Sequence, residues 1–113
     1  MNRSSQYRIS GEFVAESTAG DLVKGPGLDA DAGASIDSRT LRAGQVFFAI
    51  RGPRHDGHDH LAEAVARGAV GLVVERDRVG DALAASGPAT DRVFVVRVED
   101  TQRALAQVAA AWI

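Results

Sequence analysis

Three short apolar runs, at residues 45–50, 69–75 and 92–98, constrain the fold of this chain more than any other feature. Each run is almost uninterrupted, which is typical of a strand that is buried on both faces, as in a parallel sheet. A segment with helical periodicity follows each run. This alternation predicts an α/β fold, with a small, mostly parallel sheet and flanking helices.

Local signals place the other elements. We expect helices at residues 59–67 and 77–86 and a last helix after Asp100, with Asp59 and Asp100 as N-caps. Weaker patterns predict a helix at residues 10–18, capped by Ser10, and short strands at residues 21–24 and 34–37.

Length and composition exclude several classes of protein. The 113 residues suffice for one domain, expected at 9–113, and residues 1–8 are polar and expected to be disordered. There is no cysteine, which excludes disulfides and thiolate metal sites. A net charge of −2 argues against nucleic acid as a partner. We expect no membrane span and no signal peptide, so a cytoplasmic location is the default.

The phosphate-binding and nucleophile motifs of common enzymes are absent from this sequence. It contains no Gly-x-x-x-x-Gly-Lys-Ser/Thr loop, no Gly-x-Gly-x-x-Gly after a strand and no Gly-x-Ser-x-Gly elbow. The single lysine, Lys24, is followed by Gly-Pro and does not form a phosphate loop. We therefore expect no ATP hydrolysis and no dinucleotide binding by this chain alone.

All three histidines, His55, His58 and His60, lie within six residues and alternate with Asp56 and Asp59. Imidazole and carboxylate are ligands of zinc, iron and manganese, so a metal site is one interpretation. We favour a structural one, in which the Asp-Gly pair forms a turn, Asp59 caps the next helix and the histidines are exposed. No metal ligand is therefore assigned.

Two further clusters could hold a ligand. Residues 35–40 (Ser-Ile-Asp-Ser-Arg-Thr) combine hydroxyls with a guanidinium, although a hydrogen-bonded turn with Asp37 paired to Arg39 is the simpler interpretation. Residues 50–55 leave the carboxyl end of the strongest predicted strand, where ligands bind in open α/β sheets. There Arg51 and Arg54 could meet a phosphate, or they could simply be solvated.

These clusters occur in one order: Asp-Ser-Arg at 37–39, Phe-Phe-Ala-Ile-Arg-Gly at 47–52 and Asp-Gly-His at 56–58. The order resembles the N-terminal domain of the Mur ligases of peptidoglycan synthesis, in particular the MurE and MurF members. The likeness extends over residues 9–113, with its specific motifs at 35–70. Residues 35–52 resemble MurF more than MurE.

The resemblance implies a three-domain enzyme in which this chain is the UDP-binding domain. The whole enzyme would use ATP and magnesium, bound by a central domain, to join D-alanyl-D-alanine to UDP-N-acetylmuramoyl-tripeptide. A MurE-type ligase that adds the third, diamino acid residue is the alternative, as is a non-catalytic binding module of the same fold. The implied partners are UDP-N-acetylmuramoyl-peptide and the other two domains, and this chain alone would be inactive.

The resemblance also implies site residues, at the positions that match the motifs. Nucleotide contacts come from the apolar residue and the serine of the first motif and from the three residues after the last glycine of the second. We add the arginine and the glycine of these motifs. The candidate substrate-binding residues are Ile36, Ser38, Arg39, Gly52, Pro53, Arg54 and His55. No catalytic residue is assigned. The chain departs from the family at His60, where a large apolar residue is usual.

Overall fold

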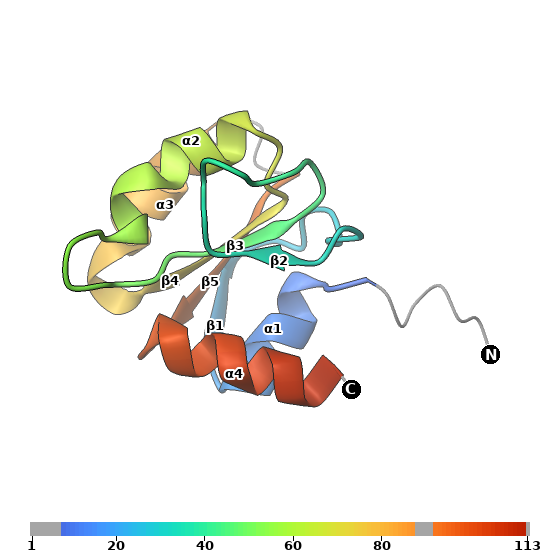
Figure 1. Cartoon of the computed structure of the whole chain (residues 1–113). Helices are drawn as coiled ribbons and strands as arrows, with labels where there is room; N and C mark the ends of the chain where they lie inside the picture. The colour runs from blue at the N-terminus through green and yellow to red at the C-terminus, as the bar shows by residue number, and fades with distance from the viewer. Residues whose placement is uncertain (1–7, 88–91, 113) are drawn as a thin grey trace.

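The chain folds into three layers, with a five-stranded sheet between two pairs of helices (Figure 1). The computed structural model describes residues 8–87 and 92–112. The strands are β1 (Asp21–Lys24), β2 (Ala34–Ser35), β3 (Val46–Phe48), β4 (Gly71–Glu75) and β5 (Phe94–Val98). The helices are α1 (Gly11–Thr18), α2 (Leu61–Ala66), α3 (Val79–Ser86) and α4 (Thr101–Trp112). Two 3₁₀ turns, η2 (Gly57–His60) and η3 (Arg76–Arg78), precede α2 and α3.

The sheet has the order β1-β5-β4-β3-β2, and its four strands from β5 to β2 are parallel. Strand β1 pairs antiparallel with β5 and closes the other edge. In the centre Phe47 lies beside Leu72, and Leu72 beside Val95. The predicted α/β fold with a mostly parallel sheet is confirmed.

Both faces of the sheet are covered, which explains the continuous apolar runs. Helices α1 and α4 cover one face, and α2 and α3 cover the other (Figure 1). Within β4, Val73 packs in the core under α1 and α4, whereas Leu72 and Val74 pack in the core under α2 and α3. Successive strand residues point to opposite faces, so a doubly covered strand needs apolar residues at every position.

The elements are shorter than expected at the carboxyl end of β3. A strand was expected at residues 45–50, but β3 ends at Phe48. The Ala49 amide still donates to the carbonyl of Val73 at 3.0 Å, whereas the Ile50 carbonyl accepts from the Gly57 amide at 2.9 Å. The chain therefore leaves the sheet at Ile50 and returns on itself at Gly57.

The start of the next helix also differs from the expectation. Asp56, not Asp59, is the N-cap, because its carboxylate accepts from the His58 amide at 2.9 Å and begins the turn η2. Helix α2 follows without a side-chain cap of its own. Asp100 and Ser10 act as expected, since they accept from the Arg103 and Phe13 amides.

The predicted disorder of residues 1–8 falls on residues 1–7, outside the described part of the chain, except for Arg8. The next residue, Ile9, is 5% exposed and pairs with Ala30 through two backbone hydrogen bonds of 2.8 and 2.7 Å. No helix among the described residues combines the length and the apolar character that crossing a membrane requires.

Candidate functional site

The loops that carry the sequence motifs meet at one edge of the sheet. Strands β2 to β5 run parallel, so the segments that follow them all leave at their carboxyl ends. These segments hold the Asp-Ser-Arg motif after β2, the Arg-Gly and Asp-Gly-His motifs after β3 and the turn η3 after β4. In open α/β sheets this is the edge at which ligands bind.

A pocket of about 370 Å³ opens at this edge, and we call it the carboxyl-edge pocket. Its walls come from the segment after β2, from β3 with the loop that follows it, and from the turn η2. The lining residues are Ile36, Asp37, Ser38, Arg39, Phe47, Ile50, His55, Gly57 and His60. Of the seven candidate residues, Ile36, Ser38, Arg39 and His55 line the pocket, whereas Gly52, Pro53 and Arg54 do not.

The wall after β2 is a hydrogen-bonded turn. The Asp37 amide donates to the Ser35 hydroxyl at 3.1 Å, and the Arg39 amide donates to the Asp37 carboxylate at 2.9 Å. The Arg39 guanidinium forms two further bonds of 3.1 Å to the same carboxylate, and these hydrogen bonds hold the pKa of Asp37 below its usual range. The predicted pair of Asp37 and Arg39 is confirmed, and 80% of the Arg39 side chain remains exposed.

Ser38 and Ile36 face different environments on this wall. Ser38 is 4% exposed, and its hydroxyl donates to the Glu63 carboxylate at 2.9 Å. Its oxygen can still accept a hydrogen bond from a ligand. Ile36 lines the pocket and is 54% exposed. The pocket thus offers an apolar surface beside a fixed hydroxyl.

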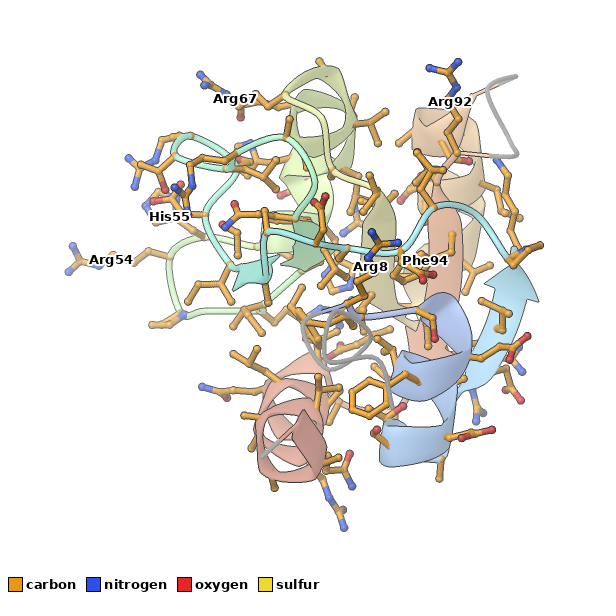
Figure 2. All side chains as sticks on the ribbon, turned by 90° about the vertical axis from the view of Figure 1, so that its right-hand side faces the viewer. Arg8, Arg54, His55, Arg67, Arg92 and Phe94 are labelled. Atoms are coloured by element: carbon orange, nitrogen blue, oxygen red, sulfur yellow. The ribbon has the colours of Figure 1, made fainter. Side chains whose placement is uncertain are left out.

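The loop after β3 carries the remaining candidates outside the pocket. The Gly52 amide donates to the His55 carbonyl at 2.7 Å, which makes a tight turn through Pro53 and Arg54. Figure 2 shows Arg54 extended away from the body of the domain. Arg54 has no hydrogen bond or ion pair within residues 8–87 and 92–112. Its positive charge is therefore free to meet a ligand at the rim.

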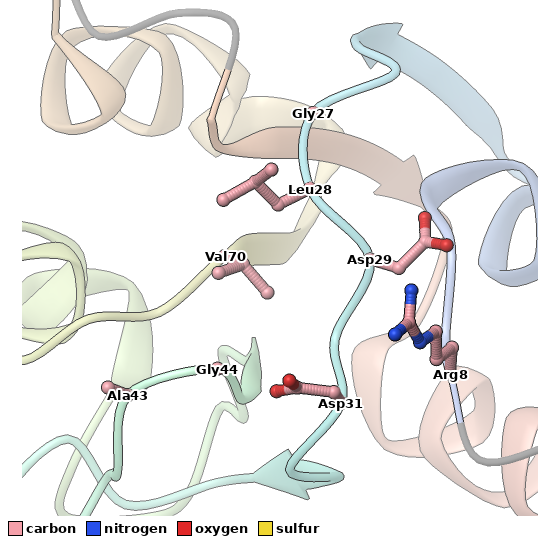
Figure 3. Close-up of a pocket in the computed structure, with 8 residues that line it drawn as sticks. All are labelled: Arg8, Gly27, Leu28, Asp29, Asp31, Ala43, Gly44 and Val70. Atoms are coloured by element: carbon pink, nitrogen blue, oxygen red, sulfur yellow. The ribbon is translucent and has the colours of Figure 1, made fainter. Parts of the chain in front are cut away.

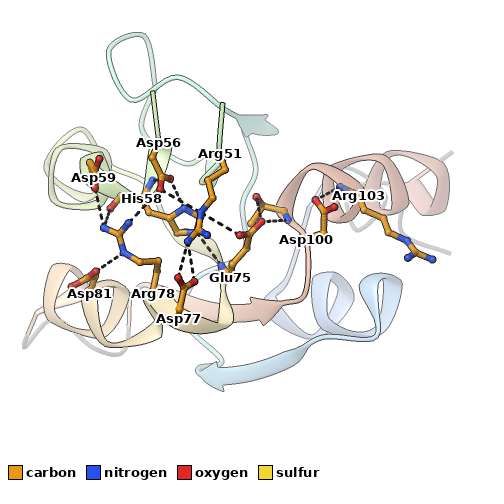
Figure 4. Close-up of polar contacts among 11 residues, drawn as sticks. Arg51, Asp56, His58, Asp59, Glu75, Asp77, Arg78, Asp81, Asp100 and Arg103 are labelled. Atoms are coloured by element: carbon orange, nitrogen blue, oxygen red, sulfur yellow. Dashed lines mark hydrogen bonds and ion pairs between the residues drawn. The ribbon is translucent and has the colours of Figure 1, made fainter. Parts of the chain in front are cut away.

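Arg51 does not supply the free positive charge that the sequence suggested. Its guanidinium binds both carboxylate oxygens of Asp77, at 2.9 and 3.0 Å, and lies 3.4 Å from Asp56 and from Glu75 (Figure 4). The hydrogen bonds with Asp77 raise the pKa of Arg51 and lower that of Asp77. Glu75 comes from β4 and Asp77 from η3, so the approach of these two carboxylates depends on the fold and not on sequence spacing.

Arg78 ties the same edge to α3. It binds Asp81 at 2.6 Å and Asp59 at 3.0 Å, and it lies 3.4 Å from Asp56 (Figure 4). It also donates to the carbonyl of His58 at 3.2 Å. The hydrogen bonds that Arg78 donates to Asp81 and Asp59 raise its pKa. Together the charged groups around these two arginines form what we call the network: Arg51, Arg78, Asp56, Asp59, Glu75, Asp77 and Asp81.

The three histidines lie in different environments. His58 is 2% exposed, contrary to the expected exposure, whereas His55 and His60 are exposed and line the pocket. His60 lies 3.8 Å from Glu63. Within the described residues no group of three or more His, Asp or Glu side chains could hold a metal ion. The histidine cluster is thus divided, with His55 and His60 at the pocket and His58 buried against Asp56, a member of the network.

Sequence reasoning missed several pocket residues. Phe47 was expected only as part of a strand, and Ile50 was placed at the start of the loop that leaves it but was not chosen as a site residue. His60 was treated as a departure at the start of a helix, yet it lines the pocket. That departure was itself a signal, because a polar ring where an apolar one is usual indicates a surface rather than a core position.

A larger pocket, of about 670 Å³, lies at the opposite edge of the sheet. We call it the amino-edge pocket. Arg8 points toward the segment with Asp29 and Asp31, and Leu28 and Val70 supply apolar surface (Figure 3). None of the candidate residues lies there. The two carboxylates make this pocket a poor site for a negatively charged nucleotide.

Comparisons with known proteins agree with the motifs. Residues 32–113 match the profile of a family described as "Mur ligase family, catalytic domain". The UDP-N-acetylmuramoyl-L-alanyl-D-glutamate–2,6-diaminopimelate ligase of Aquifex aeolicus is 40% identical over 77 residues, which cover 68% of this chain. The corresponding ligase of Geobacillus kaustophilus is 42% identical over 77 residues. The chain spans about 14% of the length of each of these relatives.

A solved structure shares the fold. A crystal structure of MurF from Acinetobacter baumannii superposes with a TM-score of 0.67 over 91% of this chain and 20% of that protein, at 25% identity. Because the family profile covers well over half of its residues, this chain belongs to the Mur ligase family.

Proposed function

We propose that this chain is the domain of a Mur ligase that holds the UDP part of a UDP-N-acetylmuramoyl-peptide in the carboxyl-edge pocket. One observation carries the proposal: the pocket gathers four of the seven candidate residues, Ile36, Ser38, Arg39 and His55, of which all but Arg39 are contacts that the resemblance itself implies. These residues come from two separate motifs, and the pocket lies at the edge where α/β sheets bind ligands.

The pocket has the chemistry that a uridine nucleotide requires. The exposed apolar side chain of Ile36 offers a surface for the flat uracil ring, and Ser38 can accept a hydrogen bond from its N–H. Arg54, which has no partner among the described residues, and Arg39 lie near or at the rim, where a diphosphate would carry its charge. The Pro53 carbonyl can accept a hydrogen bond but has no N–H to donate.

In this proposal the domain positions the substrate and does not carry out the reaction. Binding energy at the nucleotide holds the reacting carboxylate of the peptide in place elsewhere in the enzyme. ATP and magnesium would bind in another part of the ligase, since this sequence has no phosphate loop with a lysine. Its one lysine, Lys24, lies on the edge strand β1, away from the pocket, and donates a hydrogen bond to the hydroxyl of Ser86 in α3.

Two activities of the whole ligase remain candidates, and a different observation favours each. The addition of a diamino acid is favoured by the identity of 40–42% to diaminopimelate ligases. The addition of D-alanyl-D-alanine is favoured by residues 35–52 and by the superposition on MurF. The whole ligase can be incubated with ATP, its UDP-linked peptide substrate and either a labelled diamino acid or labelled D-alanyl-D-alanine. Which label is incorporated separates the two activities.

Titration of this chain with UDP-N-acetylmuramoyl-tripeptide tests the binding function. We expect weak to moderate binding, and we expect Ser38→Ala and Arg54→Ala each to weaken it. Arg92→Ala is the matched control for Arg54, because Arg92 is also exposed but lies at the amino edge (Figure 2). No binding at millimolar substrate would contradict the proposed function, and unchanged affinity in both site variants would contradict the site.

A further inference from the structure

His58 belongs to the Asp-Gly-His motif at the carboxyl edge but does not line the proposed pocket. Its side chain is 0% exposed, although it lies in a loop between exposed histidines. A buried imidazole is stable only if its ring nitrogens have hydrogen-bond partners. Both have one, because Nδ1 lies 2.6 Å from the Asp56 carboxylate and Nε2 lies 3.0 Å from the Glu75 amide.

These contacts determine where the imidazole carries its proton. The backbone N–H of Glu75 can only donate, so Nε2 must accept and carries no proton. The proton of a neutral ring is then on Nδ1 and is donated to Asp56. Both nitrogens are occupied, so His58 has none left for a metal or for a substrate.

We propose that His58 is a positioning residue for the carboxyl-edge pocket, which fastens the loop after β3 to the end of β4 through this Nδ1-protonated ring. The inference rests on the proposed function, because the pocket it shapes is the proposed nucleotide site. His58 itself does not touch the ligand.

The loop that His58 holds is a wall of the pocket. Its neighbour Gly57 lines the pocket, and the Gly57 amide donates to the Ile50 carbonyl at 2.9 Å. A Cβ at Gly57 would lie 2.9 Å from the Ile50 nitrogen, so the loop lies directly against the end of β3. On either side of this glycine, Asp56 and His58 bond to each other. The three residues of the Asp-Gly-His motif therefore act together: Asp56 caps the turn η2, Gly57 allows the loop to lie against the end of β3, and His58 holds the loop to β4.

Glu75, the β4 residue to which His58 is bonded, is itself held from the other face of the sheet. The Glu75 carboxylate accepts from the Thr101 amide at 3.0 Å and from its hydroxyl at 3.2 Å, at the start of α4. Arg51 lies 3.4 Å from the other Glu75 oxygen. The residue that receives the His58 ring is thus fixed to a helix on the other face of the sheet, which makes it a rigid support for the loop.

Two substitutions test the two hydrogen bonds of the His58 ring separately. In His58→Asn the side-chain amide can replace Nδ1 as the donor to Asp56 but does not reach the Glu75 amide. In His58→Gln the side-chain oxygen can take the place of Nε2 and accept from Glu75. We expect His58→Asn to weaken the binding of UDP about tenfold, the effect of one lost buried hydrogen bond, and His58→Gln to restore most of the affinity.

A control separates positioning from loss of stability. Val108→Ala removes buried volume from α4, on the face of the sheet opposite α2, and leaves the pocket wall intact. We expect it to lower the melting temperature while the affinity for UDP stays within about twofold. All titrations are made well below the lowest melting temperature, so that every variant is folded.

The closing experiment combines these titrations with ¹⁵N spectra of the histidine rings of this chain. The inference predicts a neutral His58 with its proton on Nδ1 and reduced UDP affinity only in His58→Asn. A proton on Nε2, or wild-type affinity in His58→Asn, overturns the inference and leaves the proposed function standing. A wild-type chain that does not bind UDP overturns the proposed function instead, and the positioning role falls with it.

Discussion

The carboxyl edge of the sheet is built in two different ways on either side of β3. Toward β2 lies the pocket, where Ile36 is 54% exposed and 80% of the Arg39 side chain is exposed. Toward β4 lies the network, where the Arg78 side chain is only 23% exposed and has three carboxylate partners. Both sides pair charged groups, yet the pair in the pocket, Arg39 with Asp37, is exposed to solvent, whereas Arg78 in the network is largely buried among its partners.

This difference shows why charge alone is a poor guide to a binding site. Arg51 and Arg54 lie three residues apart in one loop, and both suggested a phosphate contact. Arg51 faces Asp77, Glu75 and Asp56, so a ligand would have to break these pairs. Arg54 has no partner among the described residues. A ligand meets an unpaired or exposed group such as Arg54 at a lower cost than one held by several carboxylates, as Arg51 is.

The largest expected effect is the loss of an arginine from the network. Arg78→Met should lower the free energy of unfolding by about 1 kcal/mol, because it removes the shared cation of Asp59 and Asp81 and one of the partners of the part-buried Asp56. The matched variant Arg39→Met should leave stability unchanged, since its ion pair with Asp37 is exposed. Denaturant unfolding of both variants measures the difference. Equal losses would show that the two sides of β3 are not built differently.

An intermediate effect is expected in acid. Burial would raise the pKa of Asp56, but the hydrogen bonds from the His58 amide and ring outweigh it, so the pKa lies below its usual range. A lowered pKa stabilises the fold above the unfolded value of about 3.9, and this contribution is lost as the pH falls through the folded value. Stability should therefore decrease below about pH 4.

Asp56→Asn should flatten this acid dependence more than Asp37→Asn does. The pKa of Asp37 is also lowered, by its hydrogen bonds with Arg39, but that pair is exposed and screened by solvent. Unfolding free energies measured from neutral pH into this acid range give the slopes. If Asp37→Asn reduced the acid dependence more than Asp56→Asn, the exposed pair would contribute more to stability than the network, contrary to the expectation.

The smallest effect on stability, but a specific effect on binding, is expected at the pocket. Ile36→Ser should change the free energy of unfolding by less than about 0.5 kcal/mol, because the side chain is already half exposed. It should still weaken nucleotide binding severalfold, since it removes apolar surface from the proposed uracil site. Leu28→Ser, at the amino-edge pocket and 50% exposed, is the control and should change neither quantity.

The sequence predicted the layers of this fold better than the details of the site. Apolar runs report burial on both faces directly, so the three central strands could be predicted from them. Their parallel direction could be predicted from the alternation of strands and helices. The ends of these elements could not, because Ile50 leaves the sheet to bond Gly57, a contact between residues of one loop. The antiparallel direction of β1 also has no local signal, since its pairing with β5 is decided by the path of the chain.

In the candidate site, the turn with Asp37 and Arg39 was predictable because its partners are two residues apart. The burial of His58 was not, since it depends on an amide of Glu75, seventeen residues further along the chain. The partners of Arg51 were equally hidden, because Asp77 follows a different strand. Contacts between strands at one edge follow from the sheet register, which the sequence does not state.

The most direct test of the central claim is a map of the nucleotide on the chain. Backbone amide resonances followed by NMR during titration with UDP report which residues the ligand meets. The account predicts that the shifted amides cluster at the carboxyl-edge pocket, around Ile36, Ser38, Arg39 and His55, while those around Asp29 and Asp31 stay unchanged. Shifts centred on the amino-edge pocket, or no shifts at millimolar UDP, would contradict the proposed nucleotide site.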